Sequence, residues 1–355
     1  MTKPLTTTQN PIQKILSTLS RFGLDGFLLA LISMIFLAWL WPPAGIQTGI
    51  FSLKEAANLG VSLIFFFYGL RLSPEKLKSG LANWRLHLVV QISTFLVFPL
   101  IMLVIIYFFK DKSNELLWLG VFYVAALPST VSSSVVMVSI AKGNVPSAIF
   151  NASISSLIGV FITPLWMGLF LATSATSFDL SSVIVKLIIQ VLVPVVLGIL
   201  LHKKFGWFAD QHKKRLRLFD QSIILLIIYT SFCESFGSHL FSGFSMLTLL
   251  VLGISMMGLF FFMFFLIRMI CKLFNFNRED SITAIFCGSK KSLVHGTVMS
   301  KVLFHNTPGV GIIILPLMMY HALQLMAASI IAQAMSRQVV DNADYKSALA
   351  RPASQ

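Results

Sequence analysis

Charged residues are scarce in this sequence. Only 11% of the residues are Asp, Glu, Lys or Arg, and the 13 acidic residues are outnumbered by 27 basic ones. A soluble chain of this length would be roughly a quarter charged, so the composition excludes an ordinary water-soluble fold. Apolar residues make up 56% of the chain, which indicates an all-α protein embedded in a lipid bilayer.

Cysteine is also scarce, and no catalytic set is evident. The three cysteines, Cys233, Cys271 and Cys287, are odd in number and have no spacing typical of a disulfide framework or a metal site. Ser139 and Lys142 have the spacing of a Ser-Lys pair, but no histidine–carboxylate set accompanies them. We therefore expect no enzyme activity and no metal centre.

Ten apolar runs predict ten transmembrane helices (TM1 to TM10). Residues 1–25 are polar, have no cleavage-site pattern and are predicted to be a cytoplasmic tail, as are residues 336–355. The predicted spans are 26–42, 56–72, 86–109, 115–141, 145–172, 181–201, 219–238, 245–270, 280–303 and 309–335.

The basic residues set the expected orientation. With the N-terminus inside, twenty of the 27 lysines and arginines fall in cytoplasmic segments and four in outer ones. This bias predicts that both termini face the cytoplasm of a cell (inner) membrane. The net charge of +14 is thus a topology signal, and no nucleic-acid partner is expected.

An internal repeat relates the two halves of the chain. A shift of about 155 residues superimposes TM1 on TM6 and TM3 on TM8, and places a break in TM4 on a break in TM9. Residues 26–172 and 181–335 would be five-helix repeats of opposite orientation. Inverted repeats with one interrupted helix each are typical of secondary transporters with a site near the bilayer midplane.

The first interruption is the segment 127–134. Pro128 removes a backbone donor, and five neighbouring hydroxyl side chains compete for backbone groups. We expect a local unwinding whose carbonyls and hydroxyls line a site, although a proline kink with serines bonded to their own helix is the alternative. The candidate residues are Ser129, Thr130, Ser132, Ser133 and Ser134.

The second interruption, Gly288–Ser292, carries two adjacent lysines. Each costs about 2.5–3.5 kcal/mol at the bilayer centre on insertion scales, which favours a functional site over a purely structural role. Positive charge beside a half-helix N-terminus favours an anion. The candidates are Ser289, Lys290, Lys291, Ser292 and His295, with Asn151 of TM5 lining the same cavity or joining helices. Gln91, His321 and Gln324 are predicted to form interhelical bonds.

The chain resembles the bile acid:sodium symporter superfamily, in particular the sodium/bile acid cotransporter 7-like branch. The resemblance covers about residues 25–335 and is carried by the segments 65–73, 127–134, 141–144 and 288–292. It implies a panel domain of TM1, TM2, TM6 and TM7. It also implies a core domain of TM3–5 and TM8–10, in which the broken TM4 and TM9 cross.

The positions of the family's sodium ligands hold other residues here. The Ser-Asn pair falls on Ser134 and Val135, and the TM5 hydroxyls fall on Ala148 and Ala152. In TM9 the glutamate, glutamine and asparagine fall on Phe286, Lys290 and Lys291. We therefore do not expect standard two-sodium coupling, and we predict no cofactor, with sodium as the open alternative.

These observations predict a secondary transporter of a small organic anion that works by alternating access in the lipid bilayer. The lysines would act as a resident cation, a counter-charge or a proton carrier. A monovalent cation/proton exchanger and a non-transporting membrane regulator are the alternatives. The sequence does not indicate an oligomeric state.

Overall fold

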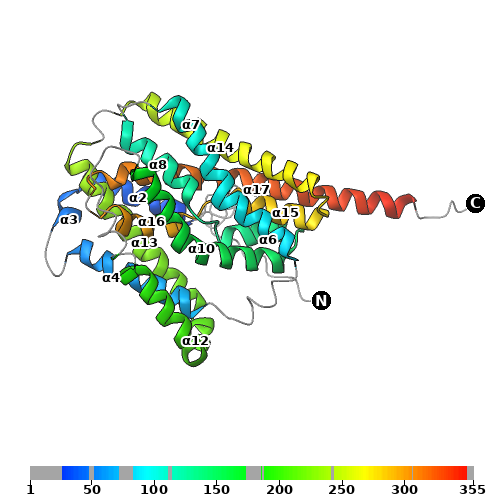
Figure 1. The fold of residues 1–355 in the computed structure, drawn as a ribbon, viewed down its shortest axis with the longest axis horizontal. Helices are drawn as coiled ribbons and strands as arrows, with labels where there is room; N and C mark the ends of the chain where they lie inside the picture. Colours follow the sequence, from blue (N-terminus) through cyan, green and yellow to red (C-terminus); the bar gives the residue numbers. More distant parts are fainter. Residues whose placement is uncertain are drawn as a thin grey trace, which may run out of the picture.

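The computed structural model describes residues 26–47, 52–71, 83–110, 114–172, 185, 188–240, 244–305 and 307–349. These residues form helices and no strands, as expected (Figure 1). The helices of the first half are α2 (Gly26–Leu40), α3 (Pro43–Ile46), α4 (Leu53–Leu70), α6 (Trp84–Ile92), the π-helix η2 (Ser93–Val97), α7 (Phe98–Phe109), α8 (Glu115–Ala126), α9 (Ser132–Ile140) and α10 (Val145–Ala172).

The described parts of the second half are also helical. Its helices are η4 (Ile188–Leu192, a π-helix), α12 (Val193–Gln211), α13 (Lys213–Gly237), α14 (Met246–Leu273), α15 (Arg278–Gly288), α16 (Leu293–Leu303) and α17 (Val310–Leu349).

Seven helical segments within the described residues are long and apolar enough to cross a membrane. The protein is therefore an integral, multi-pass membrane protein. The count of ten spans and the inverted repeat remain predictions. Two of the other predicted spans, TM4 and TM9, are divided into half-helices of 12 and 9, and of 11 and 11 residues. The remaining one, α2, has 15 residues.

Some helices continue past the predicted end of their span. In these places the sequence changes from apolar to polar residues, but no residue that breaks a helix is present. TM6 was expected to end at 201, yet α12 continues to Gln211, past the exposed Lys203 and Lys204. Similarly, α17 continues to Leu349, so the described part of the predicted tail is helical. The predicted tail 1–25 and the start of TM6 at 181 lie outside the described residues.

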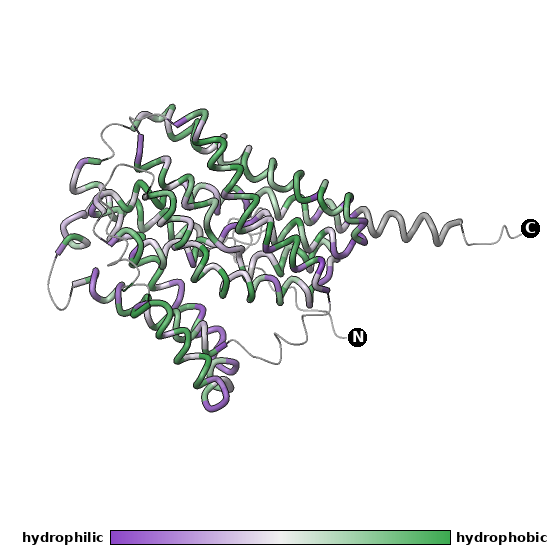
Figure 2. Tube along the Cα trace, in the orientation of Figure 1, coloured by the Kyte–Doolittle hydropathy of each residue, from purple (hydrophilic) through white to green (hydrophobic). Residues whose placement is uncertain are grey.

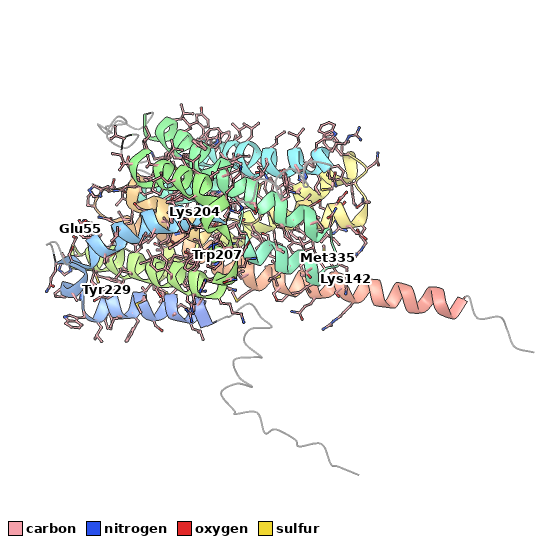
Figure 3. All side chains as sticks on the ribbon, turned by 90° about the horizontal axis from the view of Figure 1, so that it is seen from below. Glu55, Lys142, Lys204, Trp207, Tyr229 and Met335 are labelled. Atoms are coloured by element: carbon pink, nitrogen blue, oxygen red, sulfur yellow. The ribbon has the colours of Figure 1, made fainter. Side chains whose placement is uncertain are left out.

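Hydropathy follows the long axis of the helices. Apolar residues occupy their middle parts, and hydrophilic residues gather at the ends, including the turn between α12 and α13 (Figure 2). Lys142 and Met335 lie toward one end of the bundle and Glu55 toward the other (Figure 3). This distribution is the one expected for a bundle whose ends face water on both sides of a bilayer.

Two groups of helices pack within the bundle. In the first, α4 packs along α12, and α13 packs against α2, α3 and α4. Glycines allow the close approach of α4 and α12, because a Cβ at Gly69 would collide with the carbonyl oxygen of Val195, and one at Gly198 with that of Phe66. The second group contains α6 to α10 and α14 to α17. It contacts the first mainly where α13 packs against α16 and α17.

Candidate functional site at the two helix breaks

The first break separates α8 from α9, as predicted. Residues 127–131 are not helical, and Pro128 lies within them. The long helix α10 binds the backbone around this break at two points. Thr163 Oγ1 donates to the carbonyl of Ala126 (2.8 Å), and Ser155 Oγ accepts from the backbone N–H of Ser129 (3.0 Å). The freed backbone groups are thus bound by side chains eight residues apart on one helix face.

The second break separates α15 from α16, also as predicted, and α17 binds it in a comparable way. Tyr320 donates its hydroxyl to the carbonyl of Ser289 (2.6 Å). The amide of Gln324 binds the backbone of Lys291 twice: Oε1 accepts from the N–H (2.9 Å), and Nε2 donates to the carbonyl (2.8 Å). His321 Nδ1 lies 3.0 Å from Gln324 Nε2. Buried backbone groups therefore find partners despite the lost helix turn.

The two breaks touch each other, as expected. The backbone N–H of Ser292 donates to the carbonyl of Pro128 (2.9 Å), and Ser134 Oγ donates to the carbonyl of Phe286 (3.1 Å). Tyr123 of α8 donates to the carbonyl of Gly296 in α16 (2.6 Å). All four half-helices are thereby joined around one point.

Lys291 is fully buried, and its ammonium group is bound by three backbone carbonyls. Nζ donates to the carbonyls of Thr94 (2.9 Å), Ala125 (2.7 Å) and Leu127 (2.8 Å). It also lies 4.2 Å from the centre of the Phe98 ring, a favourable cation–π geometry. An ammonium group has three N–H donors and no acceptor, so every donor is used. The arrangement resembles a monovalent cation held by carbonyl dipoles.

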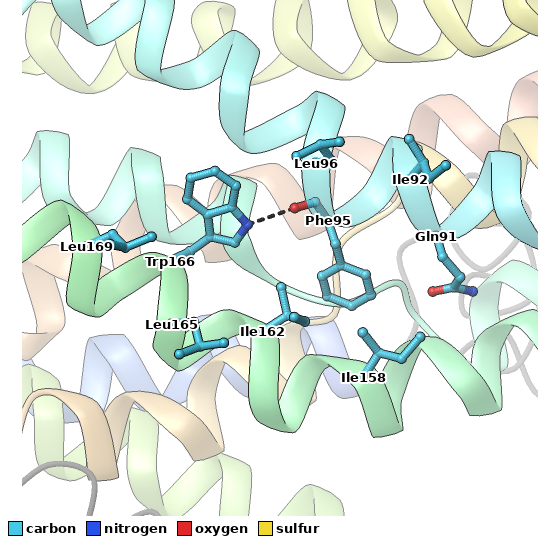
Figure 4. Close-up of a pocket in the computed structure, with 9 residues that line it drawn as sticks. All are labelled: Gln91, Ile92, Phe95, Leu96, Ile158, Ile162, Leu165, Trp166 and Leu169. Carbon is cyan, nitrogen blue, oxygen red and sulfur yellow. Dashed lines mark hydrogen bonds between the residues drawn. The ribbon is translucent and has the colours of Figure 1, made fainter.

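The π-helix η2 and Pro99 explain why the carbonyl of Thr94 is free. Pro99 has no N–H and cannot donate to the carbonyl four or five residues earlier, which are those of Phe95 and Thr94. Trp166 Nε1 binds the carbonyl of Phe95 (2.7 Å; Figure 4), and Lys291 binds that of Thr94. Single-turn π-helices are frequent at functional sites.

An open groove of about 440 Å³ lies beside this π-helix, between η2 and α10 (Figure 4). Its lining is almost wholly apolar, and Gln91 is its polar member. The groove is therefore suited to hydrocarbon and not to a charged solute.

Lys290 is fully buried too, and it points to the first break. Nζ donates to Ser133 Oγ (2.8 Å), which donates in turn to Thr130 Oγ1 (3.0 Å). Thr130 Oγ1 and Ser134 Oγ are 2.7 Å apart. The ammonium thus reaches a row of hydroxyls at the start of α9, where the helix dipole is positive. No ion pair of Lys290 or Lys291 is present among the described residues.

The remaining predicted residues have more local contacts. Ser289 Oγ donates within α15 to Ile285 (2.7 Å). Ser292 caps α16 and lies 3.0 Å from His295 Nδ1. Asn151 bonds to Gln91 and to Ser147 rather than to a break. The side chain of Ser132 lies outside the described residues.

Several residues that contact the breaks were not site candidates from the sequence. Thr94 and Tyr320 were missed, and Gln324 was expected only to join helices. The sequence pattern that could have identified Tyr320 and Gln324 is their spacing. They lie four residues apart in an apolar helix and therefore share a face.

The chain is similar to known proteins over most of its length. Over 323 residues the chain is 39% identical to the uncharacterized protein PA2026 of Pseudomonas aeruginosa, covering 91% of this chain and 96% of the relative. It is 35% identical over 315 residues (89% and 94%) to the putative symporter YfeH of Escherichia coli K12. It is also 31% identical over 320 residues (88% and 93%) to sodium/bile acid cotransporter 7 of Mus musculus.

A family match covers nearly the whole chain. Residues 25–337 match the SBF-like CPA transporter family. The resemblance to the sodium/bile acid cotransporter 7-like branch is thereby confirmed, and the family is one of transporters and not of enzymes, as expected. The chain is a membrane transport protein that belongs to the SBF-like CPA transporter family.

Proposed function

We propose that the protein is a secondary transporter that carries a small organic anion by alternating access. The observation that carries this proposal is the meeting of two broken helices at two buried lysines. Unwound backbone at membrane depth is tolerated only where it is enclosed in protein or lines a cavity, and buried charge in a membrane protein marks a solute pathway.

The charges at the breaks favour an anion. Lys290 and the N-termini of α9 and α16 place positive charge together, and within the described chain the ion pairs are Arg71–Asp220 and Lys213–Asp210, neither of which is at a break. Ser129 Oγ is buried there without a hydrogen-bond partner among the described residues. Hydroxyls and an ammonium are suitable donors for a carboxylate or sulfonate.

Alternating access requires two bodies, and the contacts support a panel of α2, α4, α12 and α13 that moves against a core. Tyr68 of α4 joins the panel to the core beside the site. Its hydroxyl donates to the carbonyl of Ser153 in α10 (2.8 Å), and its ring packs edge-on against His295 at 5.6 Å between centroids. The panel and core would comprise ten spans in two inverted repeats, with both termini in the cytoplasm of the inner membrane. The binding of one break by α10 and of the other by α17 supports such a repeat.

Lys291 limits where a coupling ion can bind. Its ammonium occupies a carbonyl site of the kind that suits a monovalent ion, so we propose that this lysine is a resident cation. One relative carries sodium and bile acid in its name, which makes sodium the first coupling ion to test and a bile acid the first solute.

Uptake by the purified protein in proteoliposomes tests the proposal. Labelled organic anions, beginning with a bile acid and continuing with small carboxylates, are offered under sodium, potassium and proton gradients. We expect saturable anion uptake that Lys290→Ala and Lys291→Ala each reduce at least tenfold, since each removes a buried ammonium whose hydrogen bonds are worth about 1.5–3 kcal/mol each. Undiminished uptake in both variants would contradict the proposed role of the lysines.

A cation/proton exchanger is the second candidate, because the carbonyls around Lys291 are also ligands for a cation. The exchanger would release the lysine from those carbonyls when the ion binds. A pH-sensitive dye inside the same vesicles separates the candidates. Proton movement driven by sodium or potassium without an organic anion would favour the exchanger.

A further inference from the structure

Four polar side chains meet at the end of the core predicted to face the cytoplasm. The carboxylate of Asp280 accepts three hydrogen bonds from asparagine amides. Oδ2 accepts from Asn83 (2.9 Å) and Asn277 (3.1 Å), and Oδ1 accepts from Asn144 (2.8 Å). Hydrogen bonds to an ionised acceptor are roughly twice as strong as neutral ones.

Each of the three asparagines immediately precedes a helix. Asn83 precedes α6, Asn144 precedes α10 and Asn277 precedes α15. The last two also cap their helices, because Asn144 Oδ1 accepts from the backbone of Ser147 (3.1 Å) and Asn277 Oδ1 from that of Asp280 (2.8 Å). One carboxylate therefore ties together the starts of three helices that lie far apart in the sequence.

The same three helices lead to the helix breaks over similar lengths of chain. Thr94 lies eleven residues after Asn83, Ser155 lies eleven after Asn144, and Lys291 lies eleven after Asp280 and fourteen after Asn277. Eleven residues of mainly helical chain span about 16 Å at 1.5 Å per residue. At that distance the carbonyl of Thr94 meets Lys291 Nζ, and Ser155 Oγ meets the backbone of the first break.

We propose that Asp280 is a positioning residue that sets the relative heights of α6, α10 and α15. Its three bonds, together with the backbone bonds of Asn144 to Glu279 and Thr283, fix the helices at one end, and packing of α15 on α6 and α10 transmits that alignment to the breaks. Loss of the bonds lets α15 shift, so Lys291 and the last turn of α15 separate from their partners.

A simpler role for Asp280 is the favourable effect of any acidic residue in the first turn of a helix. Glu279 provides the matched control. It lies in the same turn of α15, is exposed, and has the same charge. Glu279→Gln removes the charge and leaves the asparagine bonds in place.

A swapped pair separates positioning from charge more strictly. In Asp280→Asn an amide group replaces one oxygen and faces asparagine donors, so bonds are lost. Adding Asn144→Asp supplies an acceptor for that amide, while the remaining oxygen of residue 280 still accepts from Asn83 and Asn277. The swapped carboxylate can also accept from Ser147, and Asp is a favourable N-cap. The swap restores every bond and the total charge.

Cys287 reports on the alignment without requiring transport. It is fully buried in the last turn of α15, three residues before Lys290. Its alkylation by N-ethylmaleimide, followed by mass spectrometry in the full-length Cys233→Ser/Cys271→Ala protein, measures local opening.

We expect alkylation of Cys287 to be about tenfold faster in Asp280→Asn. The loss of a hydrogen bond to a charged group raises the opening equilibrium constant by about that factor or more. Glu279→Gln and the swapped pair should both react at the parent rate. Equal rates in Asp280→Asn and Glu279→Gln would overturn the proposal. If the single variant does not fold, the swapped pair decides: parent-like labelling supports the proposal, and a failure to fold or fast labelling overturns it.

Anion uptake into proteoliposomes is a separate measurement on the same variants. A chain that labels as expected but carries no solute would refute the proposed transport and leave the role of Asp280 intact.

Discussion

The side-chain amide of Gln324 binds both the N–H and the carbonyl of Lys291. This pairing takes the place of the helix hydrogen bonds that the second break interrupts. A side chain on α17 therefore determines the backbone conformation from which the buried ammonium extends.

Removing that amide should destabilise the protein. Gln324→Leu keeps the size of the side chain and leaves two buried backbone groups unpaired, at a cost of about 1–3 kcal/mol each. Thermal unfolding in detergent should show a clear fall in midpoint. Gln333→Leu is the control, because Gln333 lies on the same helix and donates to Ser329 one turn away. Equal losses in the two variants would argue against a special role for Gln324.

Replacing Lys291 should create a cation site. Lys291→Ala leaves the carbonyls of Thr94, Ala125 and Leu127 without their common donor. A sodium or potassium ion that binds there would stabilise the folded state by mass action. The unfolding midpoint of this variant should rise with sodium or potassium chloride relative to choline chloride at equal ionic strength.

The cation experiment has two controls. The parent protein should not respond, because its own ammonium fills the position, and Lys290→Ala should not respond, because its Nζ contacts a hydroxyl and no carbonyl cluster. A response of equal size in all three proteins would show that the salt acts elsewhere.

The hydroxyl of Ser133 should matter for Lys290. Ser133→Ala removes the acceptor of a buried ammonium, and a hydrogen bond to a charged group is worth about 1.5–3 kcal/mol. We expect a loss of that size in stability, and Ser133→Thr should recover it by keeping the hydroxyl. Ser139→Ala, on an exposed face of the same helix, should change stability by less than about 0.5 kcal/mol. Equal losses of stability in Ser133→Ala and Ser139→Ala would contradict the assignment of Ser133 as the hydrogen-bond acceptor of Lys290.

The contact between α4 and α12 should not tolerate a larger residue. Gly198→Val places side-chain atoms where the carbonyl of Phe66 lies, and overpacking costs about 1–3 kcal/mol. Gly258→Val introduces the same residue where nothing lies within 4 Å. The first variant should unfold at a lower temperature than the second, and the reverse order would refute this packing.

Much of the architecture was predictable because local chemistry decides it. Pro128 and its neighbouring hydroxyls indicated the first break, and Gly288 with two lysines indicated the second, close to where the helices end and restart. The start of the span 145–172 was predicted to the residue because a polar turn precedes a continuous apolar run.

The partners at the site were harder to predict because they depend on helices distant in sequence. Pro99 is visible in the sequence, but the fate of the carbonyls that it frees depends on where Lys291 and Trp166 lie. The bonds of Asp280 to Asn83 and Asn144 likewise join positions separated by 197 and 136 residues. Periodicity reports which face of a helix is apolar, and not which neighbour that face meets.

The carbonyl cluster around Lys291 has a consequence for energetics. An ammonium that is covalently attached to the chain cannot dissociate on one side of a bilayer and rebind from the other. At this position no downhill ion flux can be converted into work. Any uphill movement of a solute must draw on a different ion position, on the membrane voltage acting on the solute itself, or on a proton.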